Sequence, residues 1–155
     1  KYTIERPLHL GAALAAPDRL DDVAPLLSAY GLPLGEAFQM RDDVMGAFGD
    51  TAATGKPVGG DLREGKPTPL LARALAAANP DQLGVLRQVG RPDLTDHDVA
   101  TIQATIVATG ALADLEATIA ARSAEAVAAL DRIPLAGDAR DELAALAAYV
   151  IDRTT

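Results

Sequence analysis

Apolar side chains recur along most of this chain at intervals of three and four residues, the spacing that aligns them on one face of an α-helix. Residues 21–30 show the pattern, with apolar side chains at Val23, Leu26, Leu27 and Tyr30. The same periodicity, read together with the intervening Pro and Gly residues, predicts helices over residues 7–16, 21–30, 34–48, 69–78, 81–88, 112–130 and 138–153. A further helix is expected between Thr95 and Gly110.

Small polar residues, Gly and Pro mark the expected ends of these helices. Asp18 is expected to be the N-cap of the second helix, and Thr95 the N-cap of the helix before Gly110. Gly31-Leu32-Pro33 is expected to end the second helix, because Gly favours helix C-termini and Pro cannot continue the hydrogen-bond ladder. Gly110 is expected to end or bend its helix.

Residues 49–66 contain five Gly residues and Pro57, too many helix breakers for a regular helix, so a long loop is predicted there. Loops longer than about 12 residues inside a compact domain are usually functional or disordered. Lys56, Arg63 and Lys66 gather in this stretch of an otherwise acidic chain. This concentration of positive charge favours a ligand clamp.

Composition narrows the class of protein. Of the 155 residues 49% are hydrophobic and 3% are aromatic, which favours one domain of packed helices without an internal repeat. The net charge of −8 argues against a nucleic-acid surface, which needs clustered Lys and Arg. Cysteine is absent, which excludes disulfides, and no apolar run approaches the ~18 residues of a membrane span. We therefore expect an all-α protein of the cytoplasm, without nucleic acid or a membrane span.

The predicted helix over residues 34–48 carries a polar face. Gln39, Asp42, Asp43 and Gly46 follow one another at i, i+3, i+4 and i+7, so they share roughly one side of the helix. Adjacent carboxylates repel each other, and a hard divalent cation that takes oxygen ligands relieves this repulsion. The pattern is weak alone, since an Asp-Asp pair is usually a solvated surface feature.

The following loop strengthens the interpretation. Lys56 and Lys66 both lie beside Gly residues, which allow the backbone to come close to a ligand, and an ammonium group is a compact charge for phosphate oxygens. Aspartates that hold Mg²⁺ on one side and lysines on the other suit a diphosphate. The loop is not a Walker A motif, whose Gly-x-x-x-x-Gly-Lys-Ser/Thr pattern does not occur.

These segments, in this order, resemble the second aspartate-rich region of the trans-isoprenyl diphosphate synthases, the polyprenyl synthetase family that includes bacterial geranylgeranyl and farnesyl diphosphate synthases. The segments that carry the resemblance are residues 35–43 (GEAFQMRDD), 48–50 (FGD), 54–57 (TGKP) and 60–68 (GDLREGKPT). It extends to residues 2–8 (YTIERPL), 10–13 (LGAA) and 109–112 (TGAL), and so to essentially the whole chain.

The resemblance implies a fold and an activity. The fold would be a partial helical bundle of the isoprenoid synthase type, with residues 1–155 as the C-terminal part of one domain. The activity would be Mg²⁺-dependent prenyl transfer, in which an allylic diphosphate loses its diphosphate and isopentenyl diphosphate attacks the allylic cation. A homodimer would also be expected.

The resemblance further implies roles for particular residues. Asp42 would be the main Mg²⁺ ligand, and Asp43 a weaker or outer partner. Lys56 and Lys66 would contact the diphosphate. The remaining two predicted site residues are Gln39, which would face the allylic carbons and the water network, and Asp61, which would orient a metal-bound water.

Two features depart from the family pattern. The motif often reads Asp-Asp-x-x-Asp, but its fifth position here is Gly46, so one carboxylate is missing. The family's first aspartate-rich motif and its isopentenyl diphosphate residues would precede Lys1, so half of the active site is expected in a missing N-terminal half. We therefore expect the 155-residue chain to be inactive alone.

Two other interpretations remain open. The chain could be a non-catalytic regulatory subunit or fragment that binds Mg²⁺–diphosphate or packs on a partner chain. A terpene-cyclase-like protein would use similar helices and metal chemistry, although the Gly-Lys loop fits the chain-elongating enzymes better.

Overall fold

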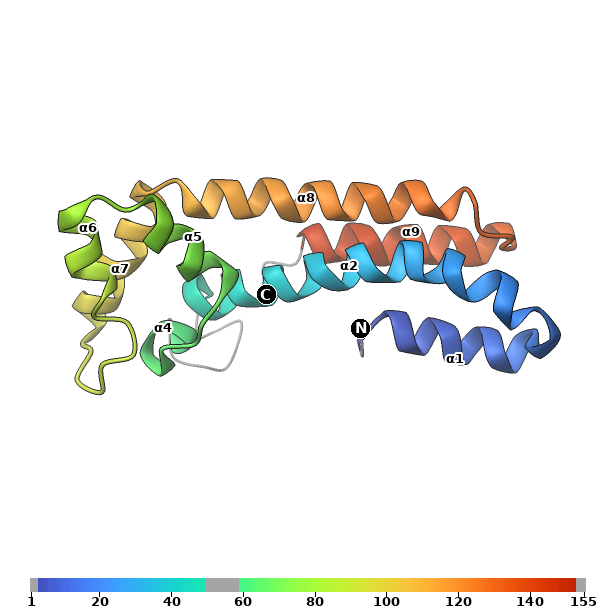
Figure 1. Ribbon diagram of the computed structural model, residues 1–155, viewed down its shortest axis with the longest axis horizontal. Coiled ribbons are helices and arrows are strands. Elements are labelled where there is room, and N and C mark those ends of the chain that lie inside the picture. Colours follow the sequence, from blue (N-terminus) through green and yellow to red (C-terminus); the bar gives the residue numbers. More distant parts are fainter. Residues whose placement is uncertain (1–2, 50–58, 153–155) are drawn as a thin grey trace. The chain divides into compact units, whose positions relative to one another are not determined.

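The structure is a computed structural model that describes residues 3–49 and 59–152. In these ranges all regular structure is helical and no strand occurs (Figure 1). The elements are α1 (Glu5–Ala15), the 3₁₀-helix η1 (Pro17–Arg19), α2 (Leu20–Phe48), α4 (Gly60–Glu64), α5 (Pro69–Ala77), α6 (Pro80–Leu86), α7 (Asp96–Ala108), α8 (Ala111–Leu130) and α9 (Gly137–Asp152).

The chain divides into two compact units, and α2 and α8 each contribute to both. Among the described residues, the first unit comprises residues 3–39 and 118–152, and the second comprises residues 40–49 and 59–117. The core of the first unit is formed by one face of each of its long helices. Its buried apolar side chains include Leu27, Tyr30, Leu34 and Ala37 from α2, Ile119, Ala126 and Leu130 from α8, and Ala147 and Val150 from α9.

Polar contacts fix α1 on α2 inside the first unit. The Ser28 hydroxyl donates to Glu5 Oε1 at 2.8 Å, and His9 Nε2 lies 2.9 Å from the Ser28 oxygen and 3.1 Å from the Ala24 carbonyl. Glu5 and Ser28 are 23 residues apart in sequence, so these bonds hold the two helices in one register.

The predicted break at Gly31-Leu32-Pro33 is wrong, because α2 continues through it with Pro25 and Pro33 inside the helix. Gly31 instead allows close packing. A Cβ atom on Gly31 would lie 3.0 Å from Glu5 Cα and 3.2 Å from Leu8 Cδ1. Burial of the neighbouring α2 side chains outweighs the local cost of proline, which lacks an N–H donor and crowds the preceding turn.

Other predicted helix ends agree with the structure to within one to three residues, apart from Asp18. Thr95 forms a reciprocal capping box with Asp98 at the start of α7, and the chain turns at Gly110 between α7 and α8. Asp18 lies within η1 instead of capping α2 from outside.

The second unit contains the end of α2, the shorter helices and the start of α8. Helices α5, α6 and α7 pack on one another (Figure 1). The buried apolar side chains here include Leu62, Leu70, Ala74, Leu86, Val99, Ile102, Ile106 and Leu115. The loop predicted over residues 49–66 is wrong where α4 forms at Gly60–Glu64, and residues 50–58 lie outside the described residues.

In the described part of the chain, no single helix is long and apolar enough to cross a membrane. Helices α7 and α8 meet that test of length and composition only when they are taken together as a bent pair.

The close approach at Gly31 can be tested by comparing Gly31→Leu with Gly11→Leu. Leucine at position 31 meets the backbone of α1, whereas position 11 is open, with no atom within 4 Å of an added Cβ. We expect Gly31→Leu to lower the free energy of unfolding in urea by about 1–3 kcal/mol. Gly11→Leu should raise it by up to about 1 kcal/mol, because leucine favours helix more than glycine does. Equal effects would show that Gly31 is not a packing site.

Tyr30 predicts a dependence of stability on alkaline pH. Its hydroxyl donates to the Leu143 carbonyl at 2.7 Å, and burial raises its pKa from 10.0 to about 12. Tyr30→Phe should cost about 1 kcal/mol of unfolding free energy below pH 10. The advantage of the wild type should be lost as the pH rises from 10 to 12, because Tyr30 ionises first in the unfolded chain. Urea titrations of both proteins between pH 8 and 12 would measure this, and parallel curves would contradict it.

Candidate functional site

The candidate site lies in the second unit, where the carboxyl-terminal part of α2 meets α4 and the residues that follow it. The Lys66 ammonium lies 2.9 Å from Asp43 Oδ1 and 2.9 Å from Asp61 Oδ2. Asp43 is 3% exposed, whereas the Lys66 side chain is 41% exposed. One cation thus joins a buried carboxylate and a second carboxylate while part of it stays accessible to solvent.

The local chain geometry brings Asp61 and Lys66 together. α4 is only five residues long, and Gly65 ends it with a φ of 69°, which glycine adopts at little cost. The Gly65 and Lys66 N–H groups both point back to the Asp61 carbonyl, the latter at 3.0 Å. The chain reverses after one turn of helix, and Lys66 returns to the aspartate at the start of that turn.

Gly46 makes room for this arrangement. A Cβ atom on Gly46 would lie 2.4 Å from both Cγ and Oδ2 of Asp61. The carboxyl group of Asp61 therefore fills the space that a side chain at position 46 would need. Position 46 is where the family motif often carries an aspartate. The Asp61 carboxylate from α4 thus lies beside α2 at Gly46, the position where α2 has no carboxylate of its own.

The two carboxylates control the charge of Lys66. Hydrogen bonds to Asp61 and then to Asp43 raise the pKa of the Lys66 ammonium well above its ordinary value of 10.5. A raised lysine pKa stabilises the folded state below pH 10.5, and this contribution is lost as the pH rises through the raised value. Lys66 is charged at neutral pH, as an unperturbed lysine would be, and the two carboxylates extend this charged state to higher pH.

A part-buried ion pair that the sequence did not reveal fixes the position of the carboxyl-terminal part of α2. Arg41, which precedes Asp42, is 8% exposed and binds Glu116 at the start of α8 through two parallel hydrogen bonds of 2.6 and 2.7 Å. Such a bidentate pair fixes geometry as well as charge. The partners are 75 residues apart, and nothing in the local pattern around Arg41 identifies Glu116.

The structure brings together only some of the predicted site residues. Asp42 is half-buried beside Asp43 on α2, and Gln39 lies one turn earlier on the same helix, in the part that belongs to the first unit. Lys56 lies outside the described residues. Arg63, part of the basic stretch, binds the Leu94 carbonyl and Asp96 instead of joining Lys66.

Carboxylate oxygens are the donors that Mg²⁺ prefers, so Asp42, Asp43 and Asp61 fit this cation by their chemistry. Asp43 and Asp61 already share the Lys66 ammonium. Within residues 3–49 and 59–152, no three side chains of His, Cys, Asp or Glu are grouped so that they could hold a metal ion. The described residues therefore do not form a metal site by themselves.

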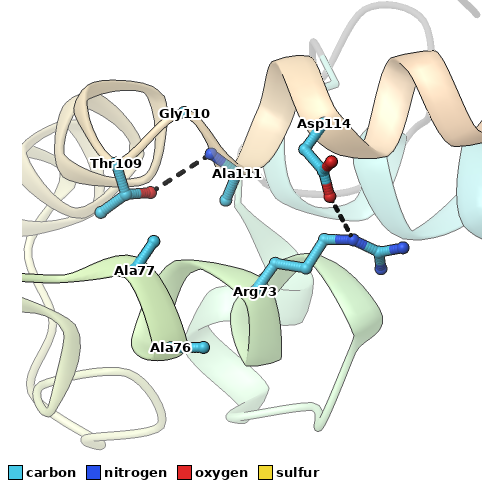
Figure 2. A pocket seen from close by; sticks show the side chains of 7 residues that line it. All are labelled: Arg73, Ala76, Ala77, Thr109, Gly110, Ala111 and Asp114. Atoms are coloured by element: carbon cyan, nitrogen blue, oxygen red, sulfur yellow. Dashed lines mark hydrogen bonds and ion pairs between the residues drawn. The ribbon is translucent and has the colours of Figure 1, made fainter.

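A separate groove of about 320 Å³ lies between the carboxyl-terminal end of α5 and the turn from α7 to α8 (Figure 2). Its clearest polar feature is an ion pair in which Arg73 Nε donates to Asp114 Oδ2 at 2.7 Å. The groove is lined by Arg73, Ala76, Ala77, Thr109, Gly110, Ala111 and Asp114, and none of the predicted site residues contributes to it.

The chain belongs to the polyprenyl synthetase family, because the family model described as Polyprenyl synthetase matches residues 2–106. Among curated relatives, a geranylfarnesyl diphosphate synthase of Aeropyrum pernix is 32% identical over 97% of this chain and 46% of its own length. A (2E,6E)-farnesyl diphosphate synthase of Mycobacterium bovis is 31% identical over 94% of this chain and 41% of its own length.

Solved structures agree with this assignment. A geranylgeranyl pyrophosphate synthase of Corynebacterium glutamicum, complexed with isoprenyl diphosphate and magnesium, has a TM-score of 0.89 and 43% identity over 98% of this chain and 43% of that one. A polyprenyl synthase of Caulobacter crescentus, complexed with calcium and isoprenyl diphosphate, has a TM-score of 0.75 and 36% identity. The match covers 85% of this chain and 40% of that one. The predicted all-α, isoprenoid-synthase fold class is confirmed, and the chain spans less than half of each of these relatives.

The coupling between Lys66 and Asp43 can be measured by a double-mutant cycle. Lys66→Met, Asp43→Asn and the double variant should give a coupling of about 1 kcal/mol in unfolding free energy, a value already reduced for the exposure of Lys66. The same cycle on the exposed pair of Arg91 and Asp93 is the control and should give a much smaller coupling. Equal couplings in the two cycles would mean that Lys66 is an ordinary surface charge.

Proposed function

We propose that this chain is the C-terminal part of a single isoprenoid synthase domain, in a Mg²⁺-dependent prenyltransferase that condenses an allylic diphosphate with isopentenyl diphosphate. Membership in the polyprenyl synthetase family supports this proposal. The magnesium and isoprenyl diphosphate in the related Corynebacterium glutamicum structure support the choice of metal and substrate class. The full protein would act in the cytoplasm, as a homodimer.

The observation that carries the proposal is the placement of Lys66. An ammonium group has three N–H donors, and Asp43 and Asp61 each accept one. The third donor of this partly exposed group is available to a phosphate oxygen, and the two carboxylates keep the ammonium charged and in position. Lys66 thus binds diphosphate as a preorganised point charge.

The other site residues have complementary roles. Asp42 is the main Mg²⁺ ligand contributed by this chain, with Asp43 as a weaker partner and Asp61 orienting a water on the metal. Bound Mg²⁺ would supply charge neutralisation for the departing diphosphate. Gln39 faces the allylic carbons and the water network, and Lys56 contacts the diphosphate together with Lys66.

In the reaction, the bond between the allylic carbon and the diphosphate oxygen breaks, and both of its electrons leave with the diphosphate. Lys66 and Lys56 stabilise the negative charge that develops on the leaving group. The double bond of isopentenyl diphosphate then attacks the allylic cation and forms the new carbon–carbon bond. Loss of a proton from the resulting carbocation restores a carbon–carbon double bond. Apart from Gln39, the site residues of this chain therefore act on the leaving group.

Because the chain spans less than half of its relatives, a second candidate function deserves a test of its own. The chain would then be a non-catalytic regulatory subunit or fragment that binds Mg²⁺–diphosphate or packs on a partner chain. Binding of inorganic diphosphate without turnover, in the protein as encoded by its gene, would favour this alternative.

The first test concerns the chain alone. We expect the purified 155-residue chain to show no prenyl transfer from geranyl diphosphate and isopentenyl diphosphate with Mg²⁺. The reason is that it supplies only one of the two groups of aspartates expected to hold the metal. Radiolabelled isopentenyl diphosphate would detect the product, with the protein as encoded by its gene as the positive control. Turnover by the 155-residue chain would contradict the idea of a divided active site.

The second test concerns the metal ligand. In the protein as encoded by its gene, Asp42→Asn should lower the Mg²⁺-dependent rate about 100-fold or more, because it removes a charged ligand from the metal. Asp22→Asn is the matched control, since it changes an exposed Asp-Asp pair near the start of the same helix. Near-normal activity of Asp42→Asn would refute the ligand role of Asp42.

A further inference from the structure

Gly65, which directly precedes Lys66 in the chain, is in close contact with Gly90 from the connection between α6 and α7. A Cβ atom on Gly65 would lie 2.9 Å from Gly90 Cα, and a Cβ atom on Gly90 would lie 3.0 Å from Gly65 Cα. The Gly90 N–H also donates to the Leu62 carbonyl in α4 at 2.9 Å. The connection between α6 and α7 therefore touches the turn that delivers Lys66, backbone against backbone.

A second contact attaches the same connection to α4. Arg63 donates to the Leu94 carbonyl at 2.7 Å and binds Asp96 at the start of α7. Helix α4 has only five residues, far fewer than a helix needs to be stable by itself. Its position is therefore set by external contacts, and Gly90 supplies one of them at the turn that directly precedes Lys66.

The geometry points to a role for Gly90 that rests on the function proposed above: Gly90 is a positioning residue for the diphosphate-binding Lys66. A side chain at Gly90 would push the backbone of Gly65 away, and Lys66 is the next residue in the chain. Since Asp61 lies at the other end of the same short helix, its carboxylate would shift with Lys66 relative to Asp43. A displacement of about 1 Å at a binding group can cost a large factor in rate or affinity.

The structure contains a matched control for this position. Gly90 and Gly110 have nearly the same positive φ angle, 83° and 81°, and both follow helices of the second unit. An added Cβ meets nothing within 4 Å at Gly110 but meets the Gly65 backbone at Gly90. Asparagine tolerates positive φ better than other residues with a Cβ. Gly90→Asn and Gly110→Asn therefore impose similar backbone strain and differ in the contact with Gly65.

The experiment measures steady-state kinetics and amide hydrogen exchange on both variants, in the protein as encoded by its gene. With geranyl diphosphate, isopentenyl diphosphate and Mg²⁺, Gly90→Asn should raise KM for geranyl diphosphate about tenfold, with a smaller change in kcat. Gly110→Asn should leave both constants within about twofold of the wild type. The exchange rate of the Lys66 amide, which donates to Asp61, should rise only in Gly90→Asn.

Each outcome bears on the proposal. An unchanged Lys66 exchange rate in Gly90→Asn, or equal KM changes in the two variants, would overturn the role of Gly90. Faster Lys66 exchange with an unchanged KM would overturn it as well, because the displacement would then not affect substrate binding. Absence of prenyl transfer by the wild type would refute the proposed function. In that case, Lys66 exchange that is faster in Gly90→Asn but not in Gly110→Asn would still show that Gly90 controls the position of Lys66.

Discussion

The ammonium group of Lys66 joins the end of α2 to α4, because carboxylate oxygens of Asp43 and Asp61 each lie 2.9 Å from it. The rest of the candidate site depends on this contact. Asp43 is buried, and a buried carboxylate is costly unless a cation or several hydrogen bonds compensate its charge. α4 is too short to hold Asp61 in place without tertiary contacts. The same ion pairs thus compensate the buried charge of Asp43 and hold the Lys66 ammonium in position.

The sequence was sufficient for features that depend on neighbouring residues. The capping box of Thr95 and Asp98 requires a fixed spacing of three residues, and the polar face of α2 follows from helical periodicity. Three predictions were wrong: the break at Gly31-Leu32-Pro33, the loop where α4 forms, and the capping position of Asp18. At Gly31 distant residues override the local preference. Gly31 resembles a helix end, but the adjacent backbone of Glu5 gives this glycine a packing role that cannot be read from the residues around it.

The candidate site shows the same division. Asp42 and Asp43 could be selected from their spacing, and Lys66 from its glycine-rich surroundings, but no local pattern indicates which carboxylates Lys66 binds. The bidentate pair of Arg41 and Glu116 joins residues 75 positions apart, so it exists only in the folded chain. Sequence spacing predicted candidate groups, and only the tertiary structure shows how Lys66 pairs with Asp43 and Asp61.

The contact between Gly46 and Asp61 has a consequence for the evolution of the motif. Any side chain at position 46 competes for space with the Asp61 carboxyl group, and an aspartate there would also add a second negative charge. A side chain at position 46 would displace the Asp61 carboxyl group from its present place, so the effect of a substitution at 46 depends on the residue fifteen positions later. A search for substitutions that restore the common family motif in this chain would have to change both positions together, since the benefit of a carboxylate at 46 depends on the residue at 61.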